Sequence, residues 1–226
     1  LGARSAANTA MTALTLQRVT DGRFSLGLGA SGPQVMEGLH GVPFARPLTR
    51  MRETIEVVRL AEAGERLALD GDQIRLPLPG GEGRALRLSL RPGDEPLAIY
   101  IASLSPRMLA LTGEVADGWL GTSFVPEGAR SSMDALAEGA ARSGRTLADL
   151  DLCQGAEVAF ARDEAELHEM LQRRKAGLAF SLGGMGSART NFYNAAYARQ
   201  GFADVAAESQ ALWLAGRRDA AAYVIP

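Results

Sequence analysis

The chain has 226 residues, of which 46% are hydrophobic and 22% charged, and its formal net charge is −2. This composition is ordinary for a globular protein, and the near-neutral charge gives no electrostatic basis for binding nucleic acid or an anionic membrane. No apolar run is long enough to cross a bilayer, no signal-peptide pattern opens the chain, and the single Cys153 excludes an internal disulfide, so we expect one cytoplasmic domain spanning residues 1–226.

The first elements of the chain alternate between helix and strand. Residues 5–19 have the pattern of a helix, which ends at Thr20-Asp21-Gly22. A short buried strand follows around residues 24–28, where apolar side chains alternate with small residues. An irregular stretch over residues 35–46 then precedes a helix over residues 47–63, whose first residue is a proline.

A hairpin interrupts this alternation. Asp70-Gly71 lies between apolar runs at residues 67–69 and 74–78, and this dipeptide is a strong signal for a tight turn between two strands. A loop rich in proline and glycine follows. We expect the hairpin to be an insertion on the rim of a sheet or barrel.

The second half of the chain returns to alternating strands and helices. Its expected elements are a strand at 97–102, a helix at 106–116, a strand at 119–121, a helix from Pro126 to Gly144, a capped turn at 147–150, a strand at 152–161, a helix after Asp163, a flexible loop at 177–187, and helices at 191–199 and 202–215. Repeated strand–helix units indicate a parallel sheet. The sequence therefore predicts an α/β fold that forms part of a (β/α) barrel, with an inserted β-hairpin and a late helical insertion.

The glycine-rich segment after the first strand is a candidate binding site. Gly29, Ser31 and Gly32 follow the strand directly, and glycine lets backbone amides approach a ligand closely because it has no Cβ. In parallel α/β proteins, ligands sit at this end of the strands. A tight turn in an ordinary barrel is the alternative. The segment also matches Gly-x-Gly-x-x-Gly, but an irregular stretch follows it instead of a long helix, which disfavours a dinucleotide-binding fold.

Residues 103–106, Ser-Leu-Ser-Pro, are a second candidate. A strand ends here and a helix begins, with a serine to cap it and Pro106 in its first turn. Free amides and the helix dipole at such a start favour an anion, and Arg107 would add a cation. The alternative is a well-capped helix that binds only water.

A few other side chains carry acid–base or polar chemistry. His40 follows the glycine-rich segment and would move protons near neutral pH, unless it is a histidine of a surface loop. Thr122 follows the strand at 119–121 and either reaches a ligand or serves as a turn residue. His168 lies among glutamates in a helix, and we expect it to be solvated. With these two histidines and Cys153, no metal-ligand cluster stands out.

Three stretches of the chain resemble the luciferase-like monooxygenase superfamily, and most closely its deazaflavin-dependent (coenzyme F420-dependent) oxidoreductases. The first comprises Asp21-Gly22-Arg23-Phe24 through Gly32-Pro33-Gln34, followed by His40-Gly41-Val42-Pro43-Phe44; the second comprises Pro47-Leu48 through Arg59; the third comprises Ile99-Tyr100-Ile101-Ala102 through Pro106 and then Gly113-Glu114-Val115-Ala116-Asp117-Gly118-Trp119-Leu120. The late segment Gly183-Gly184-Met185-Gly186 also resembles the family's corresponding insertion.

The resemblance implies a (β/α)8 barrel that transfers a hydride between coenzyme F420 and a small organic substrate, with the cofactor at the carboxyl ends of the strands. It places the cofactor phosphate at the amides around residues 103–105 and the ring near the exit of the first strand. It also implies a homodimer. The implied cofactor-binding residues are Gly29, Ser31, Gly32, Ser103, Leu104 and Ser105, and those facing the substrate are Gln34, Thr122 and the catalytic candidate His40.

Two other functions remain open on the sequence. Flavin mononucleotide (FMN) offers a phosphate to the same helix start, so an FMN-dependent monooxygenase of the same fold with a reductase partner is one alternative. The other is a non-catalytic fragment or assembly subunit that keeps the fold. The family barrel begins with about three strands that we do not find before Ser5 and ends with one that we do not find near Pro226, so we expect the barrel to be incomplete.

Overall fold

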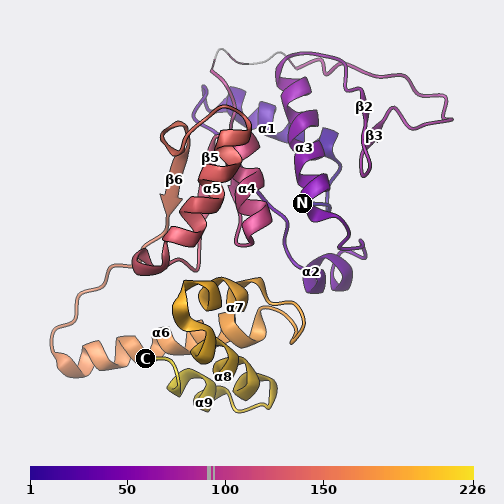
Figure 1. The fold of residues 1–226 in the computed structure, drawn as a ribbon. Coiled ribbons are helices and arrows are strands. Elements are labelled where there is room, and N and C mark those ends of the chain that lie inside the picture. The colour runs from indigo at the N-terminus through magenta and orange to yellow at the C-terminus, as the bar shows by residue number, and fades with distance from the viewer. Residues whose placement is uncertain (91–92, 94) are drawn as a thin grey trace. The chain divides into compact units, whose positions relative to one another are not determined.

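The chain folds into two compact units in a computed structural model that describes residues 1–90, 93 and 95–226 (Figure 1). Each unit is assembled from separate stretches of sequence. The first unit comprises Leu1–Ser103, Arg107–Leu120 and Ala135–Cys153, and the second comprises Leu104–Pro106, Gly121–Asp134 and Gln154–Pro226.

A sheet forms the centre of the first unit. In the described part of the chain its strands lie in the order β1-β4-β5-β6, and the pairs β1–β4 and β4–β5 are parallel. The strands are β1 (Ser25–Gly29), β4 (Ala98–Ala102), β5 (Gly118–Gly121) and β6 (Asp151–Gln154). The predicted α/β fold with a parallel sheet is confirmed, and the sheet does not close into a barrel among the described residues. The strand expected at 152–161 is wrong in length, because pairing ends at Gln154.

Helices of the first unit bury apolar side chains. The helices are α1 (Ala6–Val19), α3 (Pro47–Glu62), α4 (Pro106–Val115) and α5 (Arg130–Arg142), of which α4 belongs to this unit from Arg107 on and α5 from Ala135 on. Ser5 caps α1, because its hydroxyl accepts a bond from the Asn8 amide at 3.2 Å. α1 and α3 lie against each other (Figure 1). Their contact contributes to a core whose fully buried members include Met51, Val57, Val58, Leu97, Ile99 and Ile101.

α4 and α5 approach so closely that glycine is required at their contact. A Cβ at Gly139 would overlap the carbonyl of Ala110, and one at Gly113 would overlap the carbonyl of Leu136. Both glycines are buried, so the neighbouring backbone has no room to move away. This contact fixes the path of α4, which follows β4 directly.

The expected hairpin forms, but its strands are only β2 (Leu69–Asp70) and β3 (Arg75–Leu76). A buried carboxylate of α3 holds its turn: Glu53 accepts bonds from the amides of Asp72, Gln73 and Ile74 at 2.8, 2.9 and 2.7 Å. Glu53 therefore fixes the hairpin turn to α3, and the ion pair of Arg46 with Asp72 at 2.9 Å adds a second charged contact.

One short helix was not expected from the sequence. Pro33–Gly38 forms α2, so the interpretation of residues 35–46 as irregular throughout is wrong for the first few of them. Pro33 stands at the start, where its fixed φ suits a helix and its missing N–H costs nothing. The chain between α2 and α3 is irregular, as expected.

The second unit is helical. Its elements are the short η1 (Pro126–Gly128), α6 (Glu164–Ala179), the π-helical turn η3 (Phe180–Gly184), α7 (Phe192–Tyr197), the π-helical turn η4 (Ala198–Phe202), α8 (Ala203–Leu214) and α9 (Arg218–Tyr223). Its buried residues are mostly small: Ala179, Leu182, Ala206, Ala221 and Ile225. The flexible loop expected at 177–187 is wrong, because helix continues through Gly184. No helix in the described part of the chain combines the length and apolarity needed to span a membrane.

Candidate functional site

Strand register brings the carboxyl ends of three strands to one edge of the sheet. Gly29 of β1 pairs with Ala102 of β4, and Ala102 pairs with Leu120 of β5. Ligands of parallel α/β proteins bind at this edge, because the loops that leave it are free of the strand ladder. The segments that leave it here contain every predicted site residue.

Internal packing does not explain why two of the residues at and just after the carboxyl end of β1 are glycines. A Cβ at Gly29 would make only ordinary contact with the Ala102 Cβ, at 3.9 Å, and one at Gly32 would lie 3.5 Å from the Gln34 amide oxygen. Neither glycine has a positive φ. The packing of the described residues therefore does not require glycine at either position, and the missing Cβ atoms leave room for a ligand against the backbone.

Ser31, between these glycines, is exposed and has a φ of 63°. This left-handed backbone is uncommon for a residue with a side chain, and such conformations concentrate at binding and switch sites. Gln34 lies in α2 and His40 two residues after it, and both side chains are exposed. The predicted residues of the β1 exit therefore belong to one continuous segment of the first unit.

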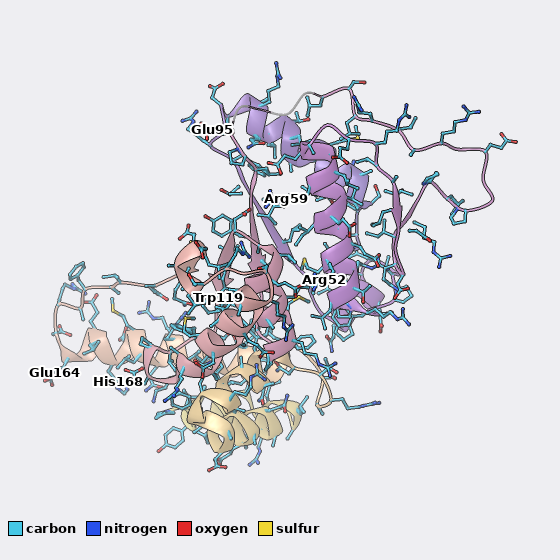
Figure 2. The ribbon with its side chains drawn as sticks, turned by 45° about the horizontal axis from the view of Figure 1, so that its top comes forward. Arg52, Arg59, Glu95, Trp119, Glu164 and His168 are labelled. Atoms are coloured by element: carbon cyan, nitrogen blue, oxygen red, sulfur yellow. The ribbon has the colours of Figure 1, made fainter. Side chains whose placement is uncertain are left out.

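Ser103, at the exit of β4, is used by the protein itself. Its hydroxyl lies 2.9 Å from that of Thr112 on α4, and its carbonyl accepts a bond from the Trp119 indole N–H at 3.1 Å. Ser103 and Trp119 are each 3% exposed, so Trp119 (labelled in Figure 2) is a core residue. These bonds fix the direction in which the chain leaves β4, and Ser103 can contribute to binding only through its backbone.

Leu104 and Ser105 are half-buried and belong to the second unit. There the Leu104 carbonyl accepts a bond from the Arg199 guanidinium at 2.7 Å. Desolvation lowers the pKa of Arg199. Arg199 forms no ion pair with any described residue, so its charge is not cancelled by a neighbouring acid. Arg107, which the sequence predicts as the cation beside this helix start, is exposed.

Thr122 follows β5 and is exposed. Next to it, Ser123 has a φ of 53° and its carbonyl accepts a bond from the Gln200 amide at 2.6 Å. Gln200 also accepts the amide of Val125 at 2.8 Å. Sequence reasoning missed Gln200 and Arg199, since no motif marks them and their partners lie 75 to 95 residues away along the chain.

Both histidines are exposed, His40 in the irregular segment after α2 and His168 on α6. His168 is exposed on α6, a helix whose start carries Glu164 and Glu166 (Figure 2). Among the residues that the structure describes, no group of three His, Cys, Asp or Glu side chains is arranged to hold a metal ion.

A cavity of about 910 Å³ lies elsewhere in the first unit, between the first turn of α1, α3 and the hairpin. Its lining includes Arg4, Arg50 and Arg75 but none of the predicted site residues. The cavity therefore neither supports nor opposes their assignment.

The opposite edge of the sheet carries a charged network with a structural task. Asp117 accepts the amide of Ile99 at 2.7 Å and Glu62 accepts that of Leu97, while Arg59 binds both carboxylates. Burial alone would lower the pKa of Arg59, but its bonds to Glu62 and Asp117 hold that pKa above its ordinary value. Arg59 thus closes the amino end of β4, which leaves the carboxyl end for binding (Figure 2).

Comparison with known proteins identifies the relatives of this chain. It is 40% identical over 233 residues to a protein of Mycobacterium tuberculosis named "Putative coenzyme F420-dependent oxidoreductase", covering 100% of this chain and 66% of that protein. It is 33% identical over 169 residues to a 5,10-methylenetetrahydromethanopterin reductase of Methanolobus tindarius, covering 75% of this chain and 49% of the relative. The chain thus spans about half to two thirds of the length of these relatives.

A solved structure shares the fold. The coenzyme F420-dependent tetrahydromethanopterin reductase from Methanopyrus kandleri superimposes with a TM-score of 0.75 at 20% identity, covering 99% of this chain and 64% of that one. The family model described as luciferase-like monooxygenase matches residues 1–226. The chain therefore belongs to the luciferase-like monooxygenase family, as its motifs indicated.

Proposed function

We propose that this chain is the larger part of an oxidoreductase that transfers a hydride between coenzyme F420 and a small organic substrate. The observation that carries the proposal is the 40% identity, over the whole chain, to the relative named for coenzyme F420. The site agrees with it, because the glycine positions at the β1 exit leave backbone accessible where a planar ring would lie.

The proposal gives each segment at the carboxyl edge a task. The backbone of residues 103–105 and the start of α4 bind the cofactor phosphate, because the backbone amides of a helix's first turn and the helix dipole favour an anion. The segment from Gly29 to Gly32 holds the ring. Gln34 and Thr122 contact the substrate.

The bound cofactor supplies the hydride chemistry, and the protein supplies orientation and electrostatics. The described residues fit this division of labour, since the segments that leave the carboxyl ends of β1, β4 and β5 carry glycine and hydroxyl groups, and Arg199 bonds to the Leu104 carbonyl within the second unit. His40 gives a proton from an imidazole nitrogen to a substrate that receives a hydride, or takes a proton from a substrate that loses a hydride, so that the substrate is left without an added charge.

Equilibrium titration of the purified protein tests the cofactor assignment. Reduced and oxidised F420, and in parallel FMN, are titrated while fluorescence is followed. We expect tight binding of F420 and at least about tenfold weaker binding of FMN, a difference of about 1.4 kcal/mol. Preference for FMN would replace the proposal with a monooxygenase, and binding of neither would remove the cofactor assignment.

The two histidines provide a matched pair of variants for the catalytic assignment. His40→Asn should lower the rate of hydride transfer about 100-fold, the lower end of the contribution of a positioned acid–base group, with little change in F420 affinity. His168→Asn, which alters the exposed histidine of α6, should leave both quantities unchanged. Equal rates for the two variants would remove His40 from the mechanism.

Three further expectations stay predictions. We propose that residues 1–226 belong to one partial barrel domain, although the chain forms two compact units. We also propose a homodimer and a cytoplasmic location. Sedimentation analysis of the purified protein tests the oligomeric state.

A further inference from the structure

Two consecutive residues of the π-helical turn η4, Arg199 and Gln200, bond through their side chains to loops that are distant in sequence. The turn joins α7 to α8, and Gly201 within it has a φ of 99°, which breaks the regular helix. Such turns are rare and frequently mark functional positions. Here the break follows directly after Arg199 and Gln200, whose side chains both bond to backbone outside their own helix.

Gln200 fixes the loop after β5. Its side-chain oxygen accepts the Val125 amide at 2.8 Å, and its nitrogen donates to the carbonyls of Ser123 and Ala196 at 2.6 and 3.0 Å. The turn lies so close to this loop that a Cβ at Gly128 would approach the Gln200 Cβ to 2.5 Å. Gln200 therefore holds Ser123 in its left-handed conformation, which few side-chain-bearing residues adopt without support.

Arg199 bonds to the loop after β4 and brings the positive charge of its guanidinium to that loop. One guanidinium N–H donates to the Leu104 carbonyl at 2.7 Å. A guanidinium has five N–H donors, and Arg199 has no acidic partner among the described residues. A neutral amide would satisfy a lone carbonyl equally well, so an arginine at this position brings a cation that the carbonyl itself does not need.

We propose that Arg199 and Gln200 are positioning residues, which fix the loops after β4 and β5, and that Arg199 also sets a positive charge beside the corner that binds the cofactor phosphate. This inference rests on the proposed function. Arg199 and Gln200 lie in the second unit, as do Leu104, Ser123, Val125 and Ala196, to which their side chains bond. The late helical insertion, to which η4 belongs, thereby fixes both loops.

Two ligands separate the charge of Arg199 from its packing: coenzyme F420, and the deazaflavin chromophore without its phosphate. Arg199→Gln keeps a donor for the Leu104 carbonyl and removes the charge. We expect it to weaken F420 binding about tenfold, a typical loss for a charge-assisted contact, and to change the affinity for the phosphate-free chromophore less than twofold. Arg199→Lys should recover most of the F420 affinity, and raising the salt concentration should weaken wild-type binding more than that of Arg199→Gln.

Arg173→Gln is the matched control, since Arg173 is, like Arg199, an exposed arginine of the second unit, but its side chain bonds to the acid Glu169 and not to the loop after β4. It should bind both ligands as the wild type does. Gln200→Leu should speed hydrogen exchange of the Val125 amide at least about tenfold, because that amide loses its acceptor. Circular dichroism of each variant establishes that the fold is retained.

Unchanged F420 affinity in Arg199→Gln would overturn the charge assignment, and unchanged exchange at Val125 in Gln200→Leu would overturn the positioning assignment. An equal loss for both ligands in Arg199→Gln would make Arg199 a purely structural residue and would also overturn the charge assignment. If the wild-type protein binds no F420, the proposed function fails by itself, and the exchange measurement still decides whether Gln200 positions its loop.

Discussion

The two units are stabilised by different means. The first unit buries large aliphatic side chains such as Met51, Leu97 and Ile101, and each such side chain contributes about 1.5–3 kcal/mol when it leaves water. The second unit buries mainly alanines, which provide little apolar area. It relies on polar side chains that bond to backbone.

Three buried or half-buried side chains show how the second unit compensates. Asn191 donates to the carbonyls of Ser181 and Leu182 at 3.1 and 2.8 Å; Asn194 donates to those of Leu182 and Ala206 at 3.1 and 2.7 Å; Ser209 donates to that of Ala221 at 2.9 Å. Hydrogen bonds are directional, whereas apolar burial is not. The second unit is therefore the one in which single polar substitutions should change local geometry, and it contains the loops after β4 and β5.

The largest effect is expected where the first unit packs most tightly. Gly139→Ala would place a Cβ against the Ala110 carbonyl, and because both helices are confined we expect the free energy of unfolding to fall by about 3 kcal/mol. Gly177→Ala is the control: Gly177 is a helical glycine of α6 with open space around it, and alanine should stabilise that helix by up to about 1 kcal/mol. Urea unfolding followed by circular dichroism measures both. A stable Gly139→Ala protein would refute the close helix contact.

In the second unit, Asn191→Ala should lower the stability by about 2 kcal/mol. The substitution removes a helix cap, since Asn191 accepts the amides of Tyr193 and Asn194 at 3.0 Å. It also removes the Asn191 side-chain donor from the carbonyls of Ser181 and Leu182, the second of which keeps Asn194 as a donor. Trp213 lies in this unit, in contact with Phe180 and Arg218, whereas Trp119 lies in the first. Unfolding is therefore followed by fluorescence in a Trp119→Phe background, where only Trp213 emits. A Trp213 unfolding transition that Asn191→Ala leaves unchanged would contradict the assignment to the second unit.

Glu53 is the exception that sharpens the comparison, because here the first unit also depends on one polar side chain. Glu53→Gln replaces one acceptor oxygen by a donor opposite the hairpin amides, and we expect a loss of about 2 kcal/mol in unfolding free energy. Glu56→Gln changes an exposed glutamate of the same helix and should have almost no effect. Equal stability of the two variants would show that the hairpin does not depend on Glu53.

The smallest expected effect is the change in stability at alkaline pH that follows from the ionisation of Tyr100. The Tyr100 hydroxyl donates to Asp151 at 2.6 Å, and this bond together with partial burial raises the pKa of Tyr100 to about 12. Since the folded pKa exceeds that of the unfolded chain, the bond's stabilisation is complete below about pH 10 and disappears as the pH rises toward 12. Ultraviolet titration should show one late-ionising phenol that Tyr100→Phe removes. A titration curve in which Tyr100→Phe removes an early component would contradict the bond.

The sequence predicted the parts of the fold that local signals determine. The Ser5 and Asp163 caps stand where a small polar residue precedes an apolar helix face, and Asp163 does accept the Glu166 amide at 2.8 Å. The Asp70-Gly71 turn follows from the same kind of signal. Glycine, proline and capping residues affect the conformation of only a few neighbouring residues, so their effects can be predicted from the sequence.

The errors have a common physical cause. The helical continuation through Gly184 was missed because glycines normally favour loops, and here Gly183 and Gly184 instead allow the Trp213 ring to lie against the turn. Arg199 and Gln200 were missed because their partners are distant in sequence and their residue types are unremarkable. A contact between residues far apart in the sequence produces no periodic pattern of residue types from which it could be predicted.

Hydrogen exchange with and without F420 tests the central claim most directly, because it locates the bound cofactor on the chain. The account predicts slower exchange of the amides at the start of α4, around Leu104 to Arg107, and at the β1 exit, around Gly29 to Gln34. The amides at the amino end of β4, around Leu97 and Ile99, should exchange as before. Protection confined to that amino end or to the cavity beside α1, with none at the carboxyl ends, would contradict the account.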